Sequence, residues 1–216
     1  MKNNFLSVFV VTIFIVIFFI ISLILSISIT RNLDSSFLIN TVLIASAFYL
    51  FFITLRDFVI NKFKNLSQTT AHFGFSLLIL SILLNNIFST EIITNLKIGE
   101  TFRSEKFNIN FEKIEQQKKQ NFMSITGKFI INNSNGTNEV LNPELRIYNQ
   151  PNIVTSEADI KTNIFTDKFM TMNLVQSQEY FNIRYQVKPF MIWIWISVML
   201  ISFGGIVTFF KKKYEK

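Results

Sequence analysis

The chain has 216 residues, of which 50% are hydrophobic and 16% are charged, and it carries a net charge of +7. It is too apolar for an ordinary soluble domain and too polar for a chain that lies in a membrane throughout, so we expect both kinds of part. Because cysteine is absent, disulfides, thiolate metal sites and a thiol nucleophile are excluded.

Four uncharged apolar runs are each long enough to cross a membrane as a helix. A cleaved signal peptide is the alternative for the first run, but that run exceeds the usual apolar core of such a peptide and no small-residue cleavage site follows it. Lys188-Pro189 places proline at the first position of the last helix. The four runs are Phe5 to Ile29, Phe37 to Leu55, Ala71 to Phe88 and Pro189 to Phe210.

The segment between the third and fourth runs changes from helical periodicity to an alternation of apolar and polar residues, which is typical of half-buried strands. An Asn-rich turn with Asn135-Gly136 indicates a hairpin within it. We therefore expect a small sandwich or barrel. The six candidate strands are Phe107 to Phe111, Phe122 to Ile131, Glu139 to Leu141, Leu145 to Tyr148, Met170 to Val175 and Phe181 to Val187.

The positive charge follows the expected membrane topology. With the amino terminus inside, the inner loop and both termini carry 8 basic and 2 acidic residues, whereas residues 89–188 carry 12 basic and 11 acidic residues. This asymmetry obeys the positive-inside rule, so the charge needs no nucleic-acid partner. The predicted fold class is a membrane α-helical protein of four transmembrane helices with one outward-facing, mostly β soluble domain. Its parts are helices one to three (1–88), the β domain (89–188), and the fourth helix with a basic inner tail (189–216).

His72 is the only histidine and lies at the start of the third apolar run. Ionisable groups in membrane helices tend to face a partner, a cofactor or a bundle interior. On residue type alone, a hydrogen-bonded structural histidine, a haem or metal ligand and a proton-relay group all remain open. Phe75, Ser76 and Ile79 follow at helical spacing, so we expect them to share the face of His72.

Three other features have ordinary structural explanations. Trp193 and Trp195 suit the aromatic belt at the outer membrane interface, and Gly204-Gly205 suits a close approach of two helices. The stretch Thr155 to Ile160 places two acids near hydroxyls, as acid–base machinery would. No second histidine, metal cluster or phosphate loop supports that interpretation, and we expect a solvated loop there.

The linear order of several motifs resembles the carboxy-terminal third of the CcmF family, the haem lyase component of cytochrome c maturation. The resemblance runs from about Leu66 to Phe210. The motifs that carry it are Ala71-His72-Phe-Gly74, Lys97-Ile-Gly99-Glu100, Thr155-Ser-Glu-Ala-Asp-Ile160, the looser Thr166-Asp-Lys-Phe169, Tyr185-x-x-Lys188-Pro189-Phe190-x-x-Trp193-Ile-Trp195, and Gly204-Gly205.

The resemblance implies that His72 is one of two membrane histidines that ligate a b-type haem. The family's tryptophan-rich haem-handling motif and its outward histidines lie upstream of the matched region, and Ile192 and Lys168 depart from its pattern. This chain is therefore expected to be a non-autonomous subunit of a split lyase, or a fragment of a longer gene. Its implied partners are other lyase subunits that supply the tryptophan-rich region and the second axial histidine, and apocytochrome c.

The resemblance also implies a location in the mitochondrial inner membrane or the bacterial cytoplasmic membrane, with the β domain in the intermembrane space or periplasm. Two alternatives stay open at this point. One is a non-catalytic assembly or docking factor without haem. The other is an unrelated membrane-anchored protein whose outer domain binds a small ligand or a polypeptide.

Overall fold

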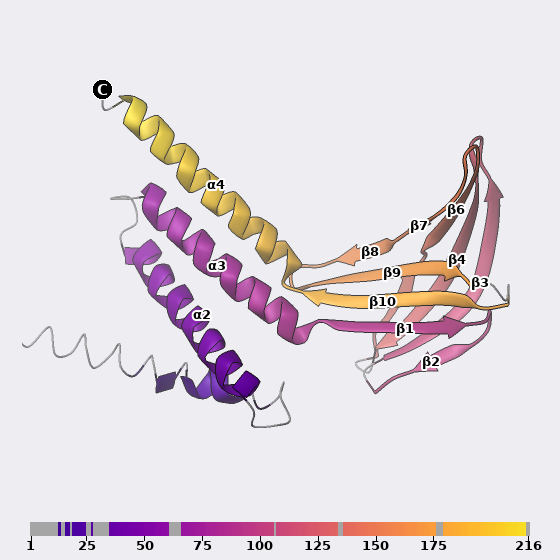
Figure 1. Ribbon diagram of the computed structural model, residues 1–216, viewed down its shortest axis with the longest axis horizontal. Coiled ribbons are helices and arrows are strands. Elements are labelled where there is room, and N and C mark those ends of the chain that lie inside the picture. Colours follow the sequence, from indigo (N-terminus) through magenta and orange to yellow (C-terminus); the bar gives the residue numbers. More distant parts are fainter. Residues whose placement is uncertain are drawn as a thin grey trace, which may run out of the picture. The chain divides into compact units, whose positions relative to one another are not determined.

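The computed structural model describes residues 13, 16, 17, 19–24, 27, 35–60, 66–105, 107–133, 136–175 and 179–214. Its elements with defined bounds are three helices and ten strands (Figure 1). The strands all belong to a compact β domain, Phe88–Pro189, and the helices form a separate unit.

The three helices are α2 (Ser35–Ile60), α3 (Leu66–Phe88) and α4 (Met191–Tyr214). Each contains a stretch that is long and apolar enough to cross a membrane. Three of the four expected spans are thus confirmed as long apolar helices. The expected first span, Phe5 to Ile29, lies mostly outside the described residues.

The helix ends differ from the sequence expectations in two places. α3 begins at Leu66 rather than Ala71, because polar residues such as Gln68 fit the first helical turn as well as a loop. Pro189 is the last residue of strand β10 and not the first residue of α4, so that prediction was wrong. Phe190 adopts a positive φ of 61°, and its carbonyl accepts hydrogen bonds from the backbone N–H groups of Trp193 and Ile194. The chain turns into the helix at Phe190.

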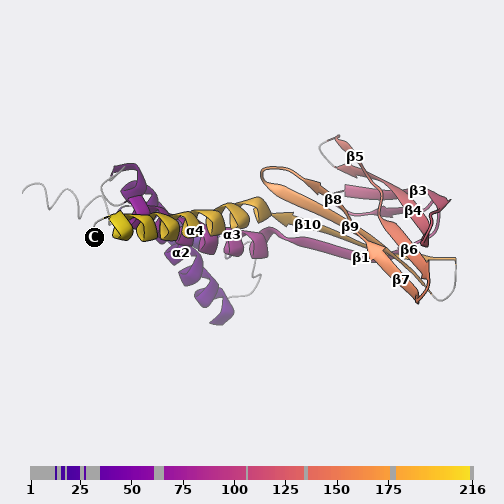
Figure 2. The ribbon, with the colours of Figure 1, turned by 90° about the horizontal axis from the view of Figure 1, so that it is seen from above.

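The β domain consists of two antiparallel sheets that face each other (Figure 2). Sheet A has the order β1-β10-β9-β8, and sheet B has the order β2-β3-β4-β6-β7 with β5 paired to β4. The strands are β1 (Thr90–Leu96), β2 (Thr101–Arg103), β3 (Phe107–Lys118), β4 (Phe122–Asn133), β5 (Asn138–Leu141), β6 (Glu144–Asn149), β7 (Asn152–Glu157), β8 (Asp159–Thr162), β9 (Thr166–Leu174) and β10 (Phe181–Pro189).

The core lies between the two sheets and is built around aromatic rings. Phe111 of β3 stacks on Phe129 of β4 with ring centroids 4.3 Å apart, and Phe107 meets Tyr185 of β10 edge-on at 5.1 Å. Gly127 is required in this packing, because a Cβ there would lie 2.7 Å from the Phe129 ring and 2.8 Å from the Met172 sulfur. The expected sandwich is confirmed.

All six candidate strands are strands in the structure, but four further strands were missed, namely β1, β2, β7 and β8. The stretch Thr155 to Ile160 is not a solvated loop. Its first three residues end β7 in sheet B and its last two begin β8 in sheet A, so the chain changes sheets at Ala158. The loop prediction was wrong because β7 and β8 expose residues on both faces and show no clear apolar alternation.

Candidate functional site

The surroundings of His72 follow from the packing of α3, which contacts a different helix on each of two faces. Small residues dominate the face toward α4. A Cβ on Gly204 would lie 2.8 Å from the Ser67 carbonyl oxygen and 2.9 Å from the Ala71 nitrogen, and a Cβ on Gly74 would lie 2.9 Å from that of Leu200. The Ser67 hydroxyl donates to the Gly204 carbonyl at 2.7 Å. The two backbones therefore approach closely along this seam.

The face of α3 toward α2 carries a polar pair and aromatic rings. The hydroxyls of Thr54 and Ser76 hydrogen-bond at 2.6 Å and are buried. The Phe73 ring packs on Phe58 at 5.2 Å and on Phe51 at 5.7 Å between centroids. Ser76 thus belongs to the α2 contact and not to the face of His72, and that part of the sequence expectation was wrong.

His72 lies on the third face of α3, which neither α2 nor α4 covers. Its side chain is exposed, as are those of Gln68 and Phe75, and Ile79 is half-buried beside them. Within the described parts of the chain, no residue forms a hydrogen bond or ion pair with the imidazole. A histidine in a helix of membrane-spanning length is costly to leave against lipid. This face is therefore open to contact from outside the described residues.

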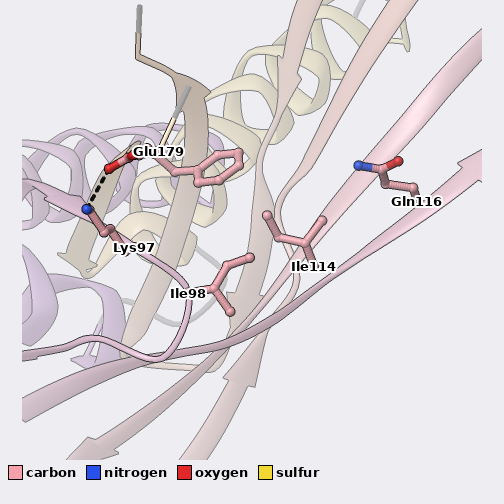
Figure 3. Close-up of a pocket in the computed structure, with 6 residues that line it drawn as sticks. Lys97, Ile98, Ile114, Gln116 and Glu179 are labelled. Carbon is pink, nitrogen blue, oxygen red and sulfur yellow. Dashed lines mark hydrogen bonds and ion pairs between the residues drawn. The ribbon is translucent and has the colours of Figure 1, made fainter. Parts of the chain in front are cut away.

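The β domain has an open hollow of about 900 Å³ beyond the end of β1. Figure 3 shows the Lys97–Glu179 pair on one side of it and Gln116 on the other. Ile98 and Ile114 lie between them. Sequence reasoning missed the hollow, since its walls come from the β1–β2 turn, β3 and the residues just before β10, which only the register brings together.

The charged wall of the hollow is an ion pair beside an aromatic ring. The Lys97 Nζ lies 2.7 Å from a Glu179 carboxylate oxygen and 4.4 Å from the Tyr180 ring centroid. The hydrogen bond to Glu179 raises the pKa of Lys97 and lowers that of Glu179. Gly99 has a φ of +86°, and a Cβ added there would have no atom within 4 Å, so the turn needs glycine for its backbone and not for space. The side chains of the pair are exposed, so their contact contributes little to stability.

The two acids of the stretch from Thr155 to Ile160 have structural partners. Glu157 lies 3.6 Å from Arg146, and Asp159 accepts a hydrogen bond from the Asn142 backbone N–H at 2.6 Å. Among the residues that the structure describes, no group of three or more His, Asp or Glu side chains could hold a metal ion. The stretch therefore connects the two sheets, and both of its acids contact neighbouring strands and turns.

Comparison with known proteins identifies the β domain. Residues 87–189 match the family described as the CcmF C-terminal beta-sandwich. The chain is similar to the carboxy-terminal part of the CcmF proteins. It is 28% identical over 145 residues to the cytochrome c-type biogenesis protein ccl1 of Rhodobacter capsulatus, and 27% identical over 145 residues to CcmF of Pseudomonas fluorescens. In both cases the match covers 67% of this chain and 22% of the relative.

A solved structure, named cytochrome c heme lyase CcmF, shares the fold. The two chains superpose with a TM-score of 0.56 at 15% identity, over 88% of this chain and 33% of the other. The chain thus spans about a fifth of the length of the curated CcmF relatives that it matches. This likeness concerns the fold, and its coverage of the chain extends beyond the β domain alone.

Proposed function

We propose that this chain is a membrane-embedded part of a cytochrome c haem lyase, in which His72 is one axial ligand of a b-type haem. A histidine from outside this sequence supplies the other axial ligand. The matched relatives are named as cytochrome c-type biogenesis proteins and a cytochrome c heme lyase. The chain corresponds to only 22% of the curated relatives' length, and the tryptophan-rich haem-handling region belongs to other polypeptide segments.

The observation that carries this proposal is the exposure of the only histidine on the uncovered face of α3. Its imidazole has no hydrogen-bond partner in the described chain and so remains available to iron, for which it is the usual protein ligand. Phe75 and Ile79 follow on the same face and provide an apolar surface for a macrocycle, and the buried Thr54–Ser76 pair fixes the helix rotation. When bound, the haem would supply electron transfer to the iron of the substrate haem.

The proposed location is an energy-transducing inner membrane, bacterial or mitochondrial, with both termini inside and the β domain outside. The excess of basic residues in the inner loop and tails supports this orientation. In this orientation the β domain follows α3 and precedes α4 in the chain. The His72 face of α3 is then available to the partner.

The test is the optical spectrum of the chain co-purified with its lyase partner. We expect His72→Ala to abolish or strongly reduce the reduced b-type absorption bands without loss of co-purification. Gln68→Ala is the matched control, because Gln68 is also exposed and lies one turn earlier on α3. A full b-type spectrum in the His72→Ala complex would contradict the assignment.

A non-catalytic docking factor is the second candidate. It would bring the β domain to a lyase without holding haem, and it predicts that the partner co-purifies with no b-type absorption in the unmodified complex. The same preparation separates the two functions, because only the haem-holding function makes the spectrum depend on His72.

A further inference from the structure

One end of sheet A lies next to both points where the chain passes between helices and the β domain. Strand β1 begins at Thr90, directly after α3 ends at Phe88, and β10 ends at Pro189, directly before α4 begins at Met191. These strands are antiparallel neighbours, so entry and exit lie at the same end of the sheet. Pro189 also pairs with Thr166, the first residue of β9. The hairpin between β8 and β9 therefore turns at this end too.

The tip of this hairpin, residues 163–165, is held in a fixed conformation. The Asn163 side-chain oxygen accepts hydrogen bonds from the backbone N–H groups of Phe165 at 2.9 Å and Thr166 at 2.7 Å. The Asn163 backbone N–H donates to the Thr166 carbonyl at 3.0 Å. This Asx turn fixes the conformation of the tip through the tip's own hydrogen bonds, without contact to another molecule.

The ordered tip presents two large apolar side chains outward. Ile164 is 61% exposed and Phe165 is 62% exposed. Turn tips usually carry glycine or small polar residues, so an adjacent isoleucine and phenylalanine at this position need an apolar environment to cover them. Ile160 of β8 is 50% exposed and extends the apolar surface along the hairpin.

The position of the tip determines what that environment is. Strands in a sheet lie about 4.8 Å apart, so the start of β9 lies about 5 Å from the end of β10 and the tip lies within roughly 15 Å of the chain's exit into α4. α3 and α4 are both of membrane-spanning length and composition, so the chain's entry and exit points lie at the membrane surface. Along the chain and the sheet, the tip is therefore within reach of the lipid headgroups.

The geometry points to the β8–β9 hairpin as a membrane-surface anchor, in which Ile164 and Phe165 insert into the interfacial region of the lipid bilayer. Lys161, exposed on β8, favours anionic headgroups beside the inserted tip. With α3 and α4, the hairpin gives the β domain a third attachment to the membrane. This inference rests on the membrane helices and does not depend on the proposed haem ligand.

The absence of cysteine from the chain allows a direct test with single-cysteine variants of the full chain. Phe165→Cys places an environment-sensitive fluorophore at the tip. Leu174→Cys is the matched control, because Leu174 is 45% exposed and lies at the far end of β9, about 30 Å from Phe165. Both variants are reconstituted into vesicles of phosphatidylcholine and phosphatidylglycerol.

We expect the label at position 165 to show blue-shifted emission, severalfold slower quenching by aqueous iodide, and strong quenching by lipids with a nitroxide near the headgroup. The label at position 174 should show none of these. Equal iodide quenching at the two positions would overturn the proposal. Shielding at position 165 that occurs only when the lyase partner is reconstituted with the chain would also overturn it, because the tip would then contact protein. Circular dichroism of each variant verifies the fold.

Discussion

At the scale of single residues, Tyr185 places a phenol hydroxyl in the core of the β domain. The side chain is 1% exposed, and its hydroxyl has no hydrogen-bond partner in the described part of the chain. Burial and the nearby Glu139 carboxylate raise the pKa of the phenol, so it stays neutral across the physiological range. A buried polar group without a partner is destabilising.

We therefore predict that Tyr185→Phe leaves the stability of the β domain unchanged or raises it by about 1 kcal/mol. Urea unfolding of the purified chain in detergent micelles, followed by far-ultraviolet circular dichroism, measures this change. Tyr185→Leu, which loses the edge-on contact with the Phe107 ring, should destabilise the domain by contrast. A loss of more than about 1 kcal/mol in Tyr185→Phe would mean that the hydroxyl has a partner outside the described residues.

At the scale of elements, the seam between α3 and α4 depends on one of two adjacent glycines. A Cβ on Gly204 would meet backbone atoms of Ser67 and Ala71 within 2.9 Å, whereas a Cβ on Gly205 would have no atom within 4 Å. We predict that Gly204→Ala destabilises the helical unit by about 1–3 kcal/mol and that Gly205→Ala does not. Thermal unfolding in detergent, followed by the fluorescence of Trp193 and Trp195 on α4, compares the two variants. Equal unfolding temperatures would contradict the packing described for this seam.

Glu144 provides a pH-dependent contact within sheet B. Its carboxylate accepts hydrogen bonds from the Arg146 guanidinium at 2.9 and 3.1 Å and from the Ser124 hydroxyl at 2.5 Å. The bond to Arg146 is the main cause of the lowered pKa of Glu144. Because the folded pKa lies below the unfolded one, near 4.3, this contribution is complete above that value and is lost as the pH falls through the folded pKa.

We predict that Glu144→Gln lowers the free energy of unfolding by about 1–3 kcal/mol at neutral pH and that the two proteins converge in stability under acid. Urea unfolding at a series of pH values checks this. Glu115→Gln is the control, since Glu115 is exposed and pairs with the exposed Lys113. Parallel pH profiles for Glu144→Gln and the unmodified chain would show that Arg146 does not act through this carboxylate.

The elements that could be predicted from the sequence are those whose apolar residues follow one period. β3 and β10 bury alternate residues over their first five positions, as with Phe107 and Phe181, and the middle of α3 is a long, mostly apolar run. β7 and β8 could not be predicted, because Ile153 and Val154 of β7 are both exposed and three of the four residues of β8 are exposed. Their strand conformation comes from pairing with β6 and β9 and not from local pattern.

At the scale of the whole molecule, the distribution of charge predicts how the chain is oriented. We expect a green fluorescent protein fused after Lys64 or after Lys216 to be fluorescent, and alkaline phosphatase at the same two points to be inactive, because the positive-inside rule predicts that both points are on the inner side. Phosphatase inserted at Gly136, in the β domain, should be active. An active phosphatase after Lys64 would contradict this orientation.

For the candidate site, the residue could be predicted from the sequence but its surroundings could not. The sequence identifies His72 as the sole histidine, and the motifs around it suggest its role. Which side of α3 it occupies depends on Gly74 facing α4 and Ser76 facing α2, and these contacts arise only when three helices pack. The small residues Ser67, Ala71 and Gly74, spaced by four and three, were the available signal for the α4 seam. Once the face toward α4 is known, the position of His72 on a different face of α3 can be deduced.

Ligand replacement tests the haem assignment most directly. His72→Gly removes the imidazole, and free imidazole added during co-expression with the lyase partner can occupy the space and coordinate the iron. We predict that the complex purified without imidazole lacks the reduced b-type spectrum and that the complex purified with imidazole regains it. A b-type spectrum of unchanged intensity in His72→Gly without imidazole would show that His72 does not ligate the haem.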